Sequence, residues 1–555
     1  MKLNRFDHHS VLVLFTILVS PLDVYAQNVP TYSEHIAPIL STHCVNCHRP
    51  NGIAPFGLDT FSAAQANAVR IAEAVTSASM PPWKPAPFYG PFEGEPEITV
   101  AETDNLVAWA TNGAPRGDTT ATLIDPTPSS WPLGEPDLIV SMEEAYPVNP
   151  GDSLEHRNFV LPVDLTERQW VRAVDILPNR AGNAAIRRGR IMLDGSGTGR
   201  TVEAEETRPG YPGLIIDHAA FPQGHILVWS PGQTPTAEQP GLAWSLEPGT
   251  DLILQLTLQP RPETVPVQAS IGLYFADEAP VLRPVGLGLN SKAFEIPAGN
   301  SDFVIQDRYR LPVGVDVLEL FPYMHYLGKT VEVTASLPDG TEVGLLQIED
   351  WDFNWQDSYR YAAPVHLPAG TSIEARFTFD NSSANPRNPS SPPVVVRHGE
   401  TMMDEMAEVL MQVLPVLPGD TEALLGNLVL KEARNDIIGL RMGDPSAPHL
   451  IVLLGRAHPP EVSGAVAMET FLEEIVAGYE AGTIDPAKYQ VLAVPLLNPD
   501  GVMRGHWRAN LGGLDLNRDW GVFSQPETAA VGAWLDGLDP AVRPVVMIDF
   551  HSTRT

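Results

Sequence analysis

The chain is poor in cysteine and in positive charge, and each shortage narrows what the protein can be. Only two of its 555 residues are cysteines, Cys44 and Cys47, and two residues separate them. A disulfide-rich scaffold is therefore excluded, and the spacing of the pair indicates a chemical site rather than a structural disulfide. Lysine and arginine number 35 against 68 aspartates and glutamates, which gives a formal net charge of −33. A field of that sign repels phosphate backbones, so no nucleic-acid partner is expected.

Long apolar runs are also missing after the N-terminus. Residues 11–20 (VLVLFTILVS) form a short apolar run that follows Lys2 and Arg5 and leads to Ala26. This pattern predicts a secretory signal peptide over residues 1–26, because the run is too short to cross a bilayer as a helix. The alternative is an uncleaved N-terminal anchor. We therefore expect a periplasmic or secreted protein that has no transmembrane segment after signal removal.

What is present indicates several folded units. Hydrophobic residues make up 43% of the chain, alongside 54 prolines and 44 glycines. The hydrophobic content excludes a disordered polymer. The many prolines and glycines are turn formers and favour a β-rich architecture. The length of the chain suggests about three to five domains. The predicted divisions are 1–26 (signal peptide), 28–117 (helical), 118–137 (linker), 138–285 and 286–415 (two β-sandwiches), 416–424 (linker) and 425–555 (α/β).

Local periodicity supports these divisions. Apolar residues with helical spacing recur in the first unit, short apolar runs between turn signals fill the middle, and strands alternate with helices at the end. Helices are expected at 33–43, 63–79, 101–112, 464–481 and 526–536. Strands are expected at 252–258, 331–335, 449–454, 489–495 and 545–550, with a hairpin turn at 338–340.

The two cysteines belong to the motif Cys44-Val45-Asn46-Cys47-His48. Two thiols at this spacing, followed at once by histidine, attach haem through its vinyl groups and provide the proximal iron ligand. Met80, followed by two prolines that stiffen the loop, is the candidate sixth ligand. The alternatives are a redox dithiol and a zinc site completed by His35 and His43.

The first unit resembles class I cytochrome c domains, and more narrowly the haem domains fused to copper monooxygenase-like sequences in bacteria. The matching stretches are HCVNCHRPNGIAPF, MPPWKP and LVAWATNGAP. The resemblance implies haem c held by Cys44, Cys47, His48 and Met80, electron transfer, and a redox partner protein or small reductant.

The middle of the chain resembles the type II copper, ascorbate-dependent monooxygenases of the peptidylglycine hydroxylase type. The resemblance rests on residues 321–329 (FPYMHYLGK), 350–356 (DWDFNWQ), 361–364, 380–389 and 404–406. It implies two jelly-roll-like β-sandwiches and two separated copper sites.

The copper ligands implied by that resemblance are mostly absent. Tyr323 stands where the family has the first histidine of a His-X-His pair, so only His325 and Met406 remain at that site. At the other site, Arg187 and Arg188 replace paired histidines, and guanidinium groups repel a metal cation. The second histidine strand of that site aligns with residues 255–259 (QLTLQ), which contain no histidine. Copper is therefore not expected, apart from a vestigial site at His325 and Met406, and His218 and His225 lie off the ligand positions.

A second metal site is predicted near the C-terminus. His458 and Glu461 lie just after the strand run 449–454, and His551 follows the run 545–550. Ligands at neighbouring strand ends of an α/β sheet can meet at one ion, and a His, Glu, His set is typical of zinc with an open position for water. Arg508 is the guanidinium that could polarise a carbonyl nearby.

This last segment resembles the carboxypeptidase A-type zinc metallopeptidases. The resemblance rests on HPPE at 458–461, NPDG at 498–501, RAN at 508–510, GLDLNRDW at 513–520 and DFHS at 549–552. It implies zinc at His458, Glu461 and His551, oxyanion stabilisation by Arg508, and a hold on the substrate's terminal carboxylate by Asn517 and Arg518. The family's general-base glutamate and a substrate-binding tyrosine lie beyond the position of Thr555, so we expect impaired peptide hydrolysis by the chain as written.

Taken together, the sequence predicts a multidomain fold. It comprises a small α-helical cytochrome c domain, two β-sandwich (jelly-roll-like) domains and a C-terminal partial α/β zinc carboxypeptidase domain. The predicted function is haem electron transfer together with carboxypeptidase-like hydrolysis of peptides. Two alternatives stay open: a haem and copper oxidoreductase acting on a small organic substrate, and a non-enzymatic binding scaffold.

Overall fold

The computed structural model describes the chain from residue 29 to residue 551, with several gaps. The predicted signal peptide therefore lies outside the described residues. In the part that is described, no helix combines the length and the apolar character needed to cross a membrane. The gaps are residues 51, 97, 119–130, 234–236, 238–240, 293, 418, 433–438, 500–501, 503–507, 511–513, 523–524, 537 and 539–540.

The first unit is helical and has its own core. Trp109 and Leu106 on the longest helix are fully buried, and the Trp109 indole donates a 3.0 Å hydrogen bond to the Pro115 carbonyl. That helix begins with a capping box in which Thr99 and Glu102 satisfy each other's backbone amides. The elements are the π-helical turn η1 (Tyr32–Ile36) and helices α1 (Ala37–His43), α2 (Phe61–Ala66), α3 (Ala68–Thr76) and α4 (Val100–Thr111).

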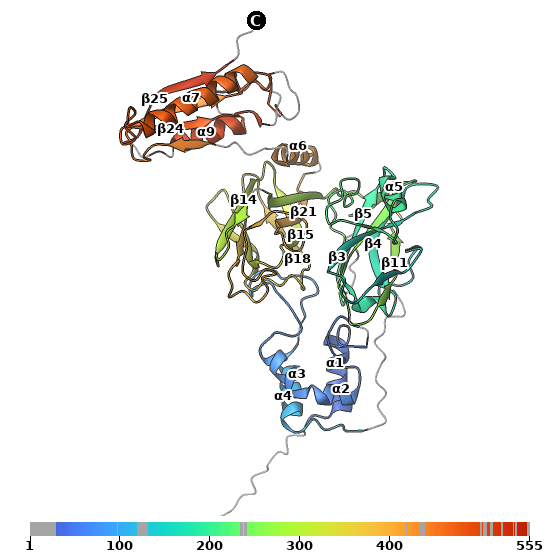
Figure 1. Cartoon of the computed structure of the whole chain (residues 1–555). Helices are drawn as coiled ribbons and strands as arrows, with labels where there is room; N and C mark the ends of the chain where they lie inside the picture. The colour runs from blue at the N-terminus through green and yellow to red at the C-terminus, as the bar shows by residue number, and fades with distance from the viewer. Residues whose placement is uncertain are drawn as a thin grey trace, which may run out of the picture.

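Two antiparallel sheets form the next unit, with one apolar core between them (Figure 1). One sheet has the order β1-β11-β4-β8, and the other has the order β6-β3-β9-β5-β7. Every residue of the central strand β9 is buried, including its polar residues Asp251, Gln255 and Thr257. The bounds are β1 (Leu138–Ser141), β2 (Tyr146–Val148), β3 (Glu155–Leu161), β4 (Gln169–Pro178), β5 (Ile186–Asp194), β6 (Tyr211–Pro212), β7 (Val228–Trp229), β8 (Trp244–Leu246), β9 (Asp251–Leu258), β10 (Val265–Val267) and β11 (Ala269–Phe275), with η2 (Gly182–Ala184) and α5 (Thr198–Ala204) between strands.

A second pair of four-stranded antiparallel sheets follows, again around its own core. The orders are β12-β21-β15-β18 and β14-β19-β16-β17. The predicted hairpin turn lies between β16 and β17, where Gly340 has φ +87°. The bounds are β12 (Val285–Ser291), β13 (Glu295–Ile296), β14 (Phe303–Arg310), β15 (Val315–Tyr323), β16 (Gly328–Ser336), β17 (Glu342–Ile348), β18 (Tyr359–Leu367), β19 (Ser372–Phe379), β20 (Val396–Arg397) and β21 (Ala407–Pro415).

The predicted second linker is partly wrong. Helix α6 (Asp420–Glu432) begins within residues 416–424, and its Leu424 and Leu428 belong to the core of the second sandwich. The helix packs on β12 and β21, so it covers that sandwich instead of opening the C-terminal unit. The turn-forming residues before α6 favoured a linker, so the burial of Leu424 and Leu428 was not predicted.

A long segment of the helical unit lies on the second sandwich. Isolated β-bridges join Pro85 to Ile348 and Phe92 to Tyr361. Trp83 packs edge-on against Tyr359, with ring centroids 5.6 Å apart. These contacts hold the helical unit against the second sandwich, and Figure 1 shows the helical unit below both sandwiches.

The C-terminal unit is the predicted α/β unit. Its sheet has the order β22-β24-β23-β25, in which β23 runs parallel to both of its neighbours. Met468 of α7 packs with Leu453 on one face, whereas Val531 of α9 packs with Leu450 and Val452 on the other. Because side chains alternate along a strand, the two helices cover opposite faces of the sheet. The bounds are β22 (Leu440–Met442), β23 (His449–Gly455), α7 (Val462–Glu480), β24 (Tyr489–Val494), η3 (Leu516–Arg518), α9 (Pro526–Asp536) and β25 (Arg543–Phe550).

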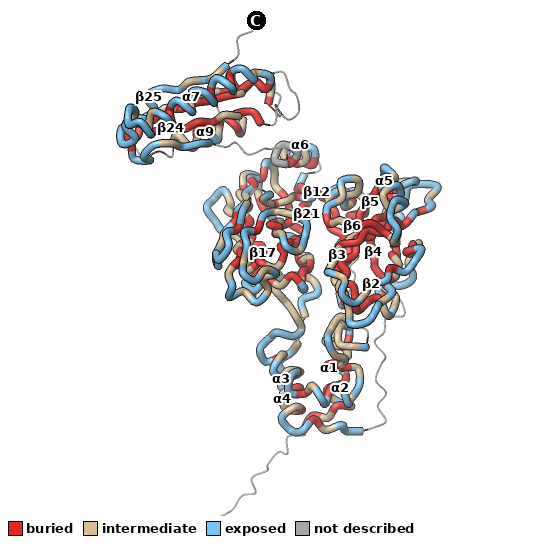
Figure 2. Tube along the Cα trace, viewed as in Figure 1, coloured by how far each residue is buried: buried red, intermediate tan, exposed pale blue. Residues whose placement is uncertain are grey.

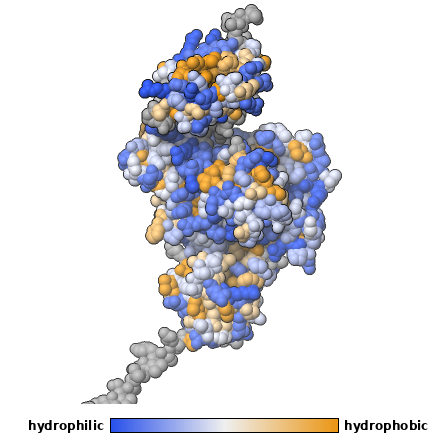
Figure 3. Space-filling model, turned by 60° about the vertical axis from the view of Figure 1, so that its left-hand side comes forward, coloured by the Kyte–Doolittle hydropathy of each residue, from blue (hydrophilic) through white to orange (hydrophobic). Residues whose placement is uncertain are grey.

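The buried residues are grouped within the separate units. Figure 2 shows buried residues concentrated inside each sandwich and along the C-terminal sheet. Strand β25 is the exception, because Val545, Val546 and Met547 remain 48%, 46% and 48% exposed. Figure 3 shows apolar surface gathered on the C-terminal unit.

Candidate metal centre

The structure brings His458, Glu461 and His551 together at one edge of the C-terminal sheet. His458 lies in the loop after β23, Glu461 is the N-cap of α7, and His551 directly follows β25. Strands β23 and β25 are parallel neighbours, so their carboxyl ends meet at the same edge. Gly464 allows the close approach of α7, since a Cβ there would lie 2.6 Å from the Phe550 carbonyl oxygen.

The three side chains offer converging ligand atoms. Nδ1 of His458 lies 2.9 Å from Oε1 of Glu461, and Nδ1 of His551 lies 4.0 Å from Oε2 of the same carboxylate. The two imidazole rings meet edge to face, with centroids 5.0 Å apart. Among the described residues, this is the single group of three histidine, cysteine or acidic side chains whose ligand atoms all lie within 4.8 Å of one another.

One buried atom in this group supports the binding of a cation. Oε2 of Glu461 is buried and accepts no hydrogen bond. A buried carboxylate oxygen without a donor is costly unless a cation or a proton satisfies it. The set of two imidazoles and one carboxylate suits zinc, so the residues present fit the predicted metal.

Asp515 supports His458 from behind, a role that was not predicted from the sequence. Its Oδ1 lies 2.9 Å from Nε2 of His458 and accepts the Asn517 amide at 3.1 Å. Burial raises the pKa of Asp515, but the hydrogen bonds from His458 and Asn517 and the Arg508 charge outweigh it and lower the pKa below its ordinary value. A proton on Nε2 directs the lone pair of Nδ1 toward Glu461, which is the tautomer that binds a metal. The sequence feature that could have indicated this role is the position of Asp515, two residues before Asn517.

The residues expected to contact substrate surround the same carboxylate. The Nε atoms of Arg508 and Arg518 lie 3.3 Å and 3.5 Å from Oδ2 of Asp515. Their side chains are 48% and 81% exposed, so both guanidinium groups are accessible from solvent. The side-chain amide of Asn517 contacts Nε2 of His551. Nδ1 of that histidine also lies 2.9 Å from Oδ1 of Asp549, whose pKa is raised by burial.

The predicted haem ligands line one cavity of about 330 Å³. Cys44, Cys47, His48 and Met80 all contribute to its wall. Both thiols are free, and burial raises the pKa of Cys44 to about 12 and also raises that of Cys47. Nδ1 of His48 donates a 3.1 Å hydrogen bond to the Phe56 carbonyl, which leaves Nε2 as the ligating nitrogen.

The zinc alternative for this motif has less support than haem. His35 accepts the Thr31 amide through Nδ1, and His43 lies 3.5 Å from Glu102. Neither histidine forms a group of three ligands with the cysteines in the described part of the chain. The residues present therefore fit a covalently held haem better than a zinc ion.

The copper-like residues lie in the interface between the two sandwiches. Tyr323 and Met406 belong to one small apolar cluster there, and His325 lies beside Tyr323 with ring centroids 5.5 Å apart. The guanidinium carbons of Arg188 and Arg190 stand 5.3 Å and 4.7 Å from the centre of the Tyr323 ring. Two cations next to the ring do not fit copper, although Nε2 of His325 is buried without a hydrogen-bond partner.

Other residues named from the sequence have ordinary partners. Gln255 is buried and donates to the Asn158 side chain and to the Leu214 carbonyl at 2.9 Å and 3.0 Å. His218 contacts the Tyr211 hydroxyl at 2.8 Å, and Arg187 contacts Gln259. His156 was missed by the sequence analysis, and its Nε2 is also buried without a partner near the same interface.

Comparison with family models identifies the C-terminal unit. Residues 434–555 match the family model for zinc carboxypeptidases. The chain is 35% identical over 104 residues to human cytosolic carboxypeptidase 4, which covers 18% of this chain and 9% of that protein. It is 32% identical over 108 residues to cytosolic carboxypeptidase 6 of Caenorhabditis elegans, which covers 19% of this chain and 24% of that protein. The chain thus spans less than a quarter of the length of either relative.

Solved structures include a metallo-carboxypeptidase from Pseudomonas aeruginosa. It is 14% identical with a TM-score of 0.16, and the match covers 46% of this chain and 63% of that one, which is too slight to carry an argument. On the family model and the relatives, the C-terminal unit is a carboxypeptidase A-type zinc peptidase domain.

The prediction of a periplasmic or secreted location is wrong by the same comparisons. The relatives carry the name cytosolic carboxypeptidase. The residues on which the prediction rested, 1–26, lie outside the described residues.

Proposed function

We propose that the C-terminal unit removes C-terminal residues from peptides with a zinc ion held by His458, Glu461 and His551. The observation that carries this proposal is the convergence of the three ligand atoms around the unpartnered Oε2 of Glu461. A zinc ion there would supply polarisation of a peptide carbonyl and acidification of a bound water.

The remaining residues have separate tasks in this proposal. Asp515 holds the proton on Nε2 of His458, so the imidazole keeps one orientation. Arg508, at the rim of the site, donates hydrogen bonds to the oxygen on which negative charge develops. Arg518 and Asn517 grip the terminal carboxylate of the substrate, for which a planar guanidinium fork is well suited.

Peptide hydrolysis by the full chain tests this proposal. In keeping with the impaired hydrolysis expected from the sequence, we expect slow release of the last residue from a peptide with a free C-terminal carboxylate, and none from the same peptide with a C-terminal amide. Removal of zinc with a chelator should abolish the release, and added zinc should restore it.

Two variants distinguish a specific loss of the zinc site from a general loss of activity. Glu461→Gln should abolish release, whereas His366→Gln should not change it, because His366 lies on the second sandwich with a side chain that is 60% exposed. Equal release from the amidated peptide, or full activity of Glu461→Gln, would contradict the proposal.

We infer as a second function that the helical unit carries covalent haem and transfers electrons. The specific observation is a cavity whose wall includes both thiols, His48 and Met80. Haem there would supply a one-electron couple, while the Phe56 carbonyl orients His48 and Met80 lines the same cavity.

Covalent attachment is measured directly by a pyridine haemochrome assay on the denatured chain after expression with cytochrome c maturation proteins. We expect covalent haem in the natural chain and none in Cys44→Ala/Cys47→Ala. Met80→Ala should keep the haem and change its axial-ligand spectrum, whereas Met403→Ala, at a methionine that is 51% exposed, should change neither. Covalent haem in the double cysteine variant would refute this inference.

A further inference from the structure

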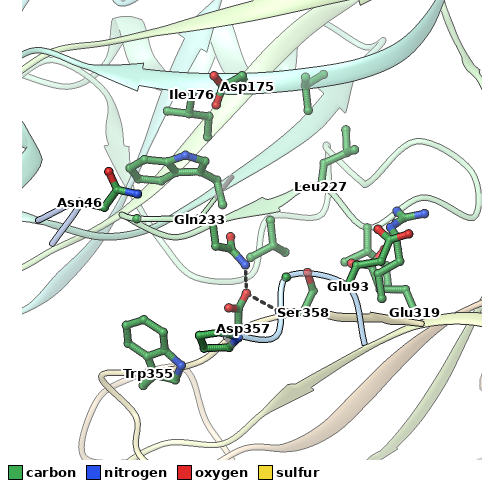
Figure 4. Close-up of a pocket in the computed structure, with 18 of the residues that line it drawn as sticks. Asn46, Glu93, Asp175, Ile176, Leu227, Gln233, Glu319, Trp355, Asp357 and Ser358 are labelled. Carbon is green, nitrogen blue, oxygen red and sulfur yellow. Dashed lines mark hydrogen bonds and ion pairs between the residues drawn. The ribbon is translucent and has the colours of Figure 1, made fainter. Parts of the chain in front are cut away.

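A cavity of about 400 Å³ lies where the helical unit and both sandwiches meet. Asn46 and Glu93 of the helical unit contribute to its wall. Figure 4 shows Asp175 of β4 on one side of the space and Asp357, just before β18, on the other. No function derived above uses this cavity.

The wall is rich in carboxylates. They come from three parts of the chain: Glu93 in the helical unit, Asp175 in the first sandwich, and Glu319 and Asp357 in the second. Arg360 is the one lysine or arginine among the lining residues, and its Nη2 already lies 2.7 Å from Oε2 of Glu319. Within the described residues, no ion pair within 4.0 Å neutralises Glu93, Asp175 or Asp357.

Each of these three acids is incompletely compensated, and the charge of Arg188 lowers the pKa of Asp357 by less than burial raises it. Oε2 of Glu93 is buried and accepts no hydrogen bond. Asp357 is 8% exposed and accepts hydrogen bonds from the Ser358 amide at 2.8 Å and from Gln233, and burial raises its pKa to about 7. Asp175 is 4% exposed, and burial raises its pKa to about 6. A cation that enters the cavity would relieve these burial costs.

The wall also has aromatic and apolar side chains, next to polar ones such as Asn46 and Gln233. Ile176 and Leu227 face the space between the acids in Figure 4. The indole Nε1 of Trp355 is buried without a hydrogen-bond acceptor, so one polar atom of a ligand could satisfy it. Aromatic rings around a cavity attract cations through their π faces. Four tryptophans line it: Trp83, Trp229, Trp244 and Trp355.

The acids do not form a metal site. In the described part of the chain, three ligand atoms of histidine, cysteine or acidic side chains converge within 4.8 Å only at His458, Glu461 and His551. The carboxylates of the cavity are instead distributed around a space that is large enough for a small organic molecule. Spread charges beside tryptophan rings match a ligand that has a charged group and an apolar body.

We propose that this cavity binds an organic ammonium ion that carries an apolar or aromatic group. Glu93 and Asp357 attract the ammonium group, and the tryptophans surround the apolar group. Cys47 and His43 also line this cavity, so the ligand would lie beside the Cys44–His48 motif. This site is independent of the peptidase site in the C-terminal unit.

Calorimetric titration of the full chain with benzyltrimethylammonium tests the proposal, because that probe keeps its charge at every pH. Benzyl alcohol and benzoate serve as neutral and anionic probes of similar size. We expect saturable 1:1 binding of the cation, at least about tenfold tighter than either control, with a change in tryptophan fluorescence.

Variants locate the site. Glu93→Gln and Asp357→Asn keep the shape of the wall and should each weaken binding of the cation without changing that of benzyl alcohol. Glu278→Gln, at an exposed acid that is not among the lining residues, should bind the cation like the natural chain. No cation binding at millimolar concentration, equal binding of benzyl alcohol, or unchanged affinity in both cavity variants would overturn the proposal.

Discussion

Nε2 of His458 lies 2.9 Å from Oδ1 of Asp515, on the side of the imidazole opposite Glu461. The carboxylate behind the ring therefore decides which nitrogen carries the proton. It also links His458 to the segment that bears Asn517 and Arg518, since Asp515 is the N-cap of η3. The metal ligands and the substrate-facing residues thus share one anchor.

Replacing Asp515 tests that anchor. We expect Asp515→Asn to lower zinc affinity roughly 10- to 100-fold, because an outer partner fixes both the ring orientation and the tautomer of a ligating histidine. The measurement is competition for zinc against a chromophoric chelator. The control Asp485→Asn removes an exposed aspartate from the turn after α7 and should leave the affinity unchanged. Unchanged affinity in Asp515→Asn would show that the contact has no role in metal binding.

A second prediction concerns the packing of α7 on β25. Gly464→Ala places a Cβ 2.6 Å from the Phe550 carbonyl oxygen, so the helix must move away from the strand end that presents His551. We expect lower zinc affinity together with a lower unfolding temperature. Gly426 in α6 is the matched control, because a Cβ there has no atom within 4 Å.

The control should behave in the opposite way. Gly426→Ala is expected to stabilise its helix by about 0.5–1 kcal/mol, since alanine loses less backbone entropy than glycine in a helix. Thermal unfolding followed by circular dichroism measures both variants. Equal zinc affinity for Gly464→Ala and the natural chain would mean that α7 does not set the position of Glu461.

The raised pKa of Asp357 predicts that the stability of the folded chain depends on pH. Its pKa is raised in the folded chain from 3.8 to about 7, so the folded state holds a proton that the unfolded state has released. The groups that face it are Arg188, Glu319, Gln233 and the Ser358 amide. Stability should therefore fall as pH rises from about 4 to about 7, by up to a few kcal/mol.

Asp357→Asn removes that cost while keeping the side chain's shape. We expect the variant to be more stable than the natural chain at pH 8, and the gain to shrink at pH 5, where the natural aspartate is already protonated in the folded state. Unfolding in urea at the two pH values measures the difference. A gain of equal size at both values would rule out the titration of Asp357 as its cause.

Local patterns in the sequence predicted much of the fold. The apolar run at 252–258 corresponds to β9, the run at 449–454 to β23, and the helical spacing at 464–481 to α7. These elements bury a stripe or a whole strand, so their spacing is visible in the residues themselves. The prediction of a multidomain, β-rich chain with a carboxypeptidase-like α/β unit at its C-terminal end is confirmed.

Features that depend on distant parts of the chain were not predictable in this way. Asp515 gains its role only when the fold brings it to His458, 57 residues away in sequence. Leu424 of α6 looks like a linker residue until β12 and β21 are beside it. The acidic cavity requires Glu93, Asp175 and Asp357 from three units, and no spacing in the sequence relates them.

The metal content of the purified chain tests the central claim most directly. Iron, copper and zinc are counted per chain by mass spectrometry for the natural protein and for Glu461→Gln/His551→Ala. We predict one zinc per natural chain, close to none in the double variant, and no stoichiometric copper in either. Zinc retained by the double variant, or a natural chain that binds no zinc, would contradict a zinc centre at His458, Glu461 and His551.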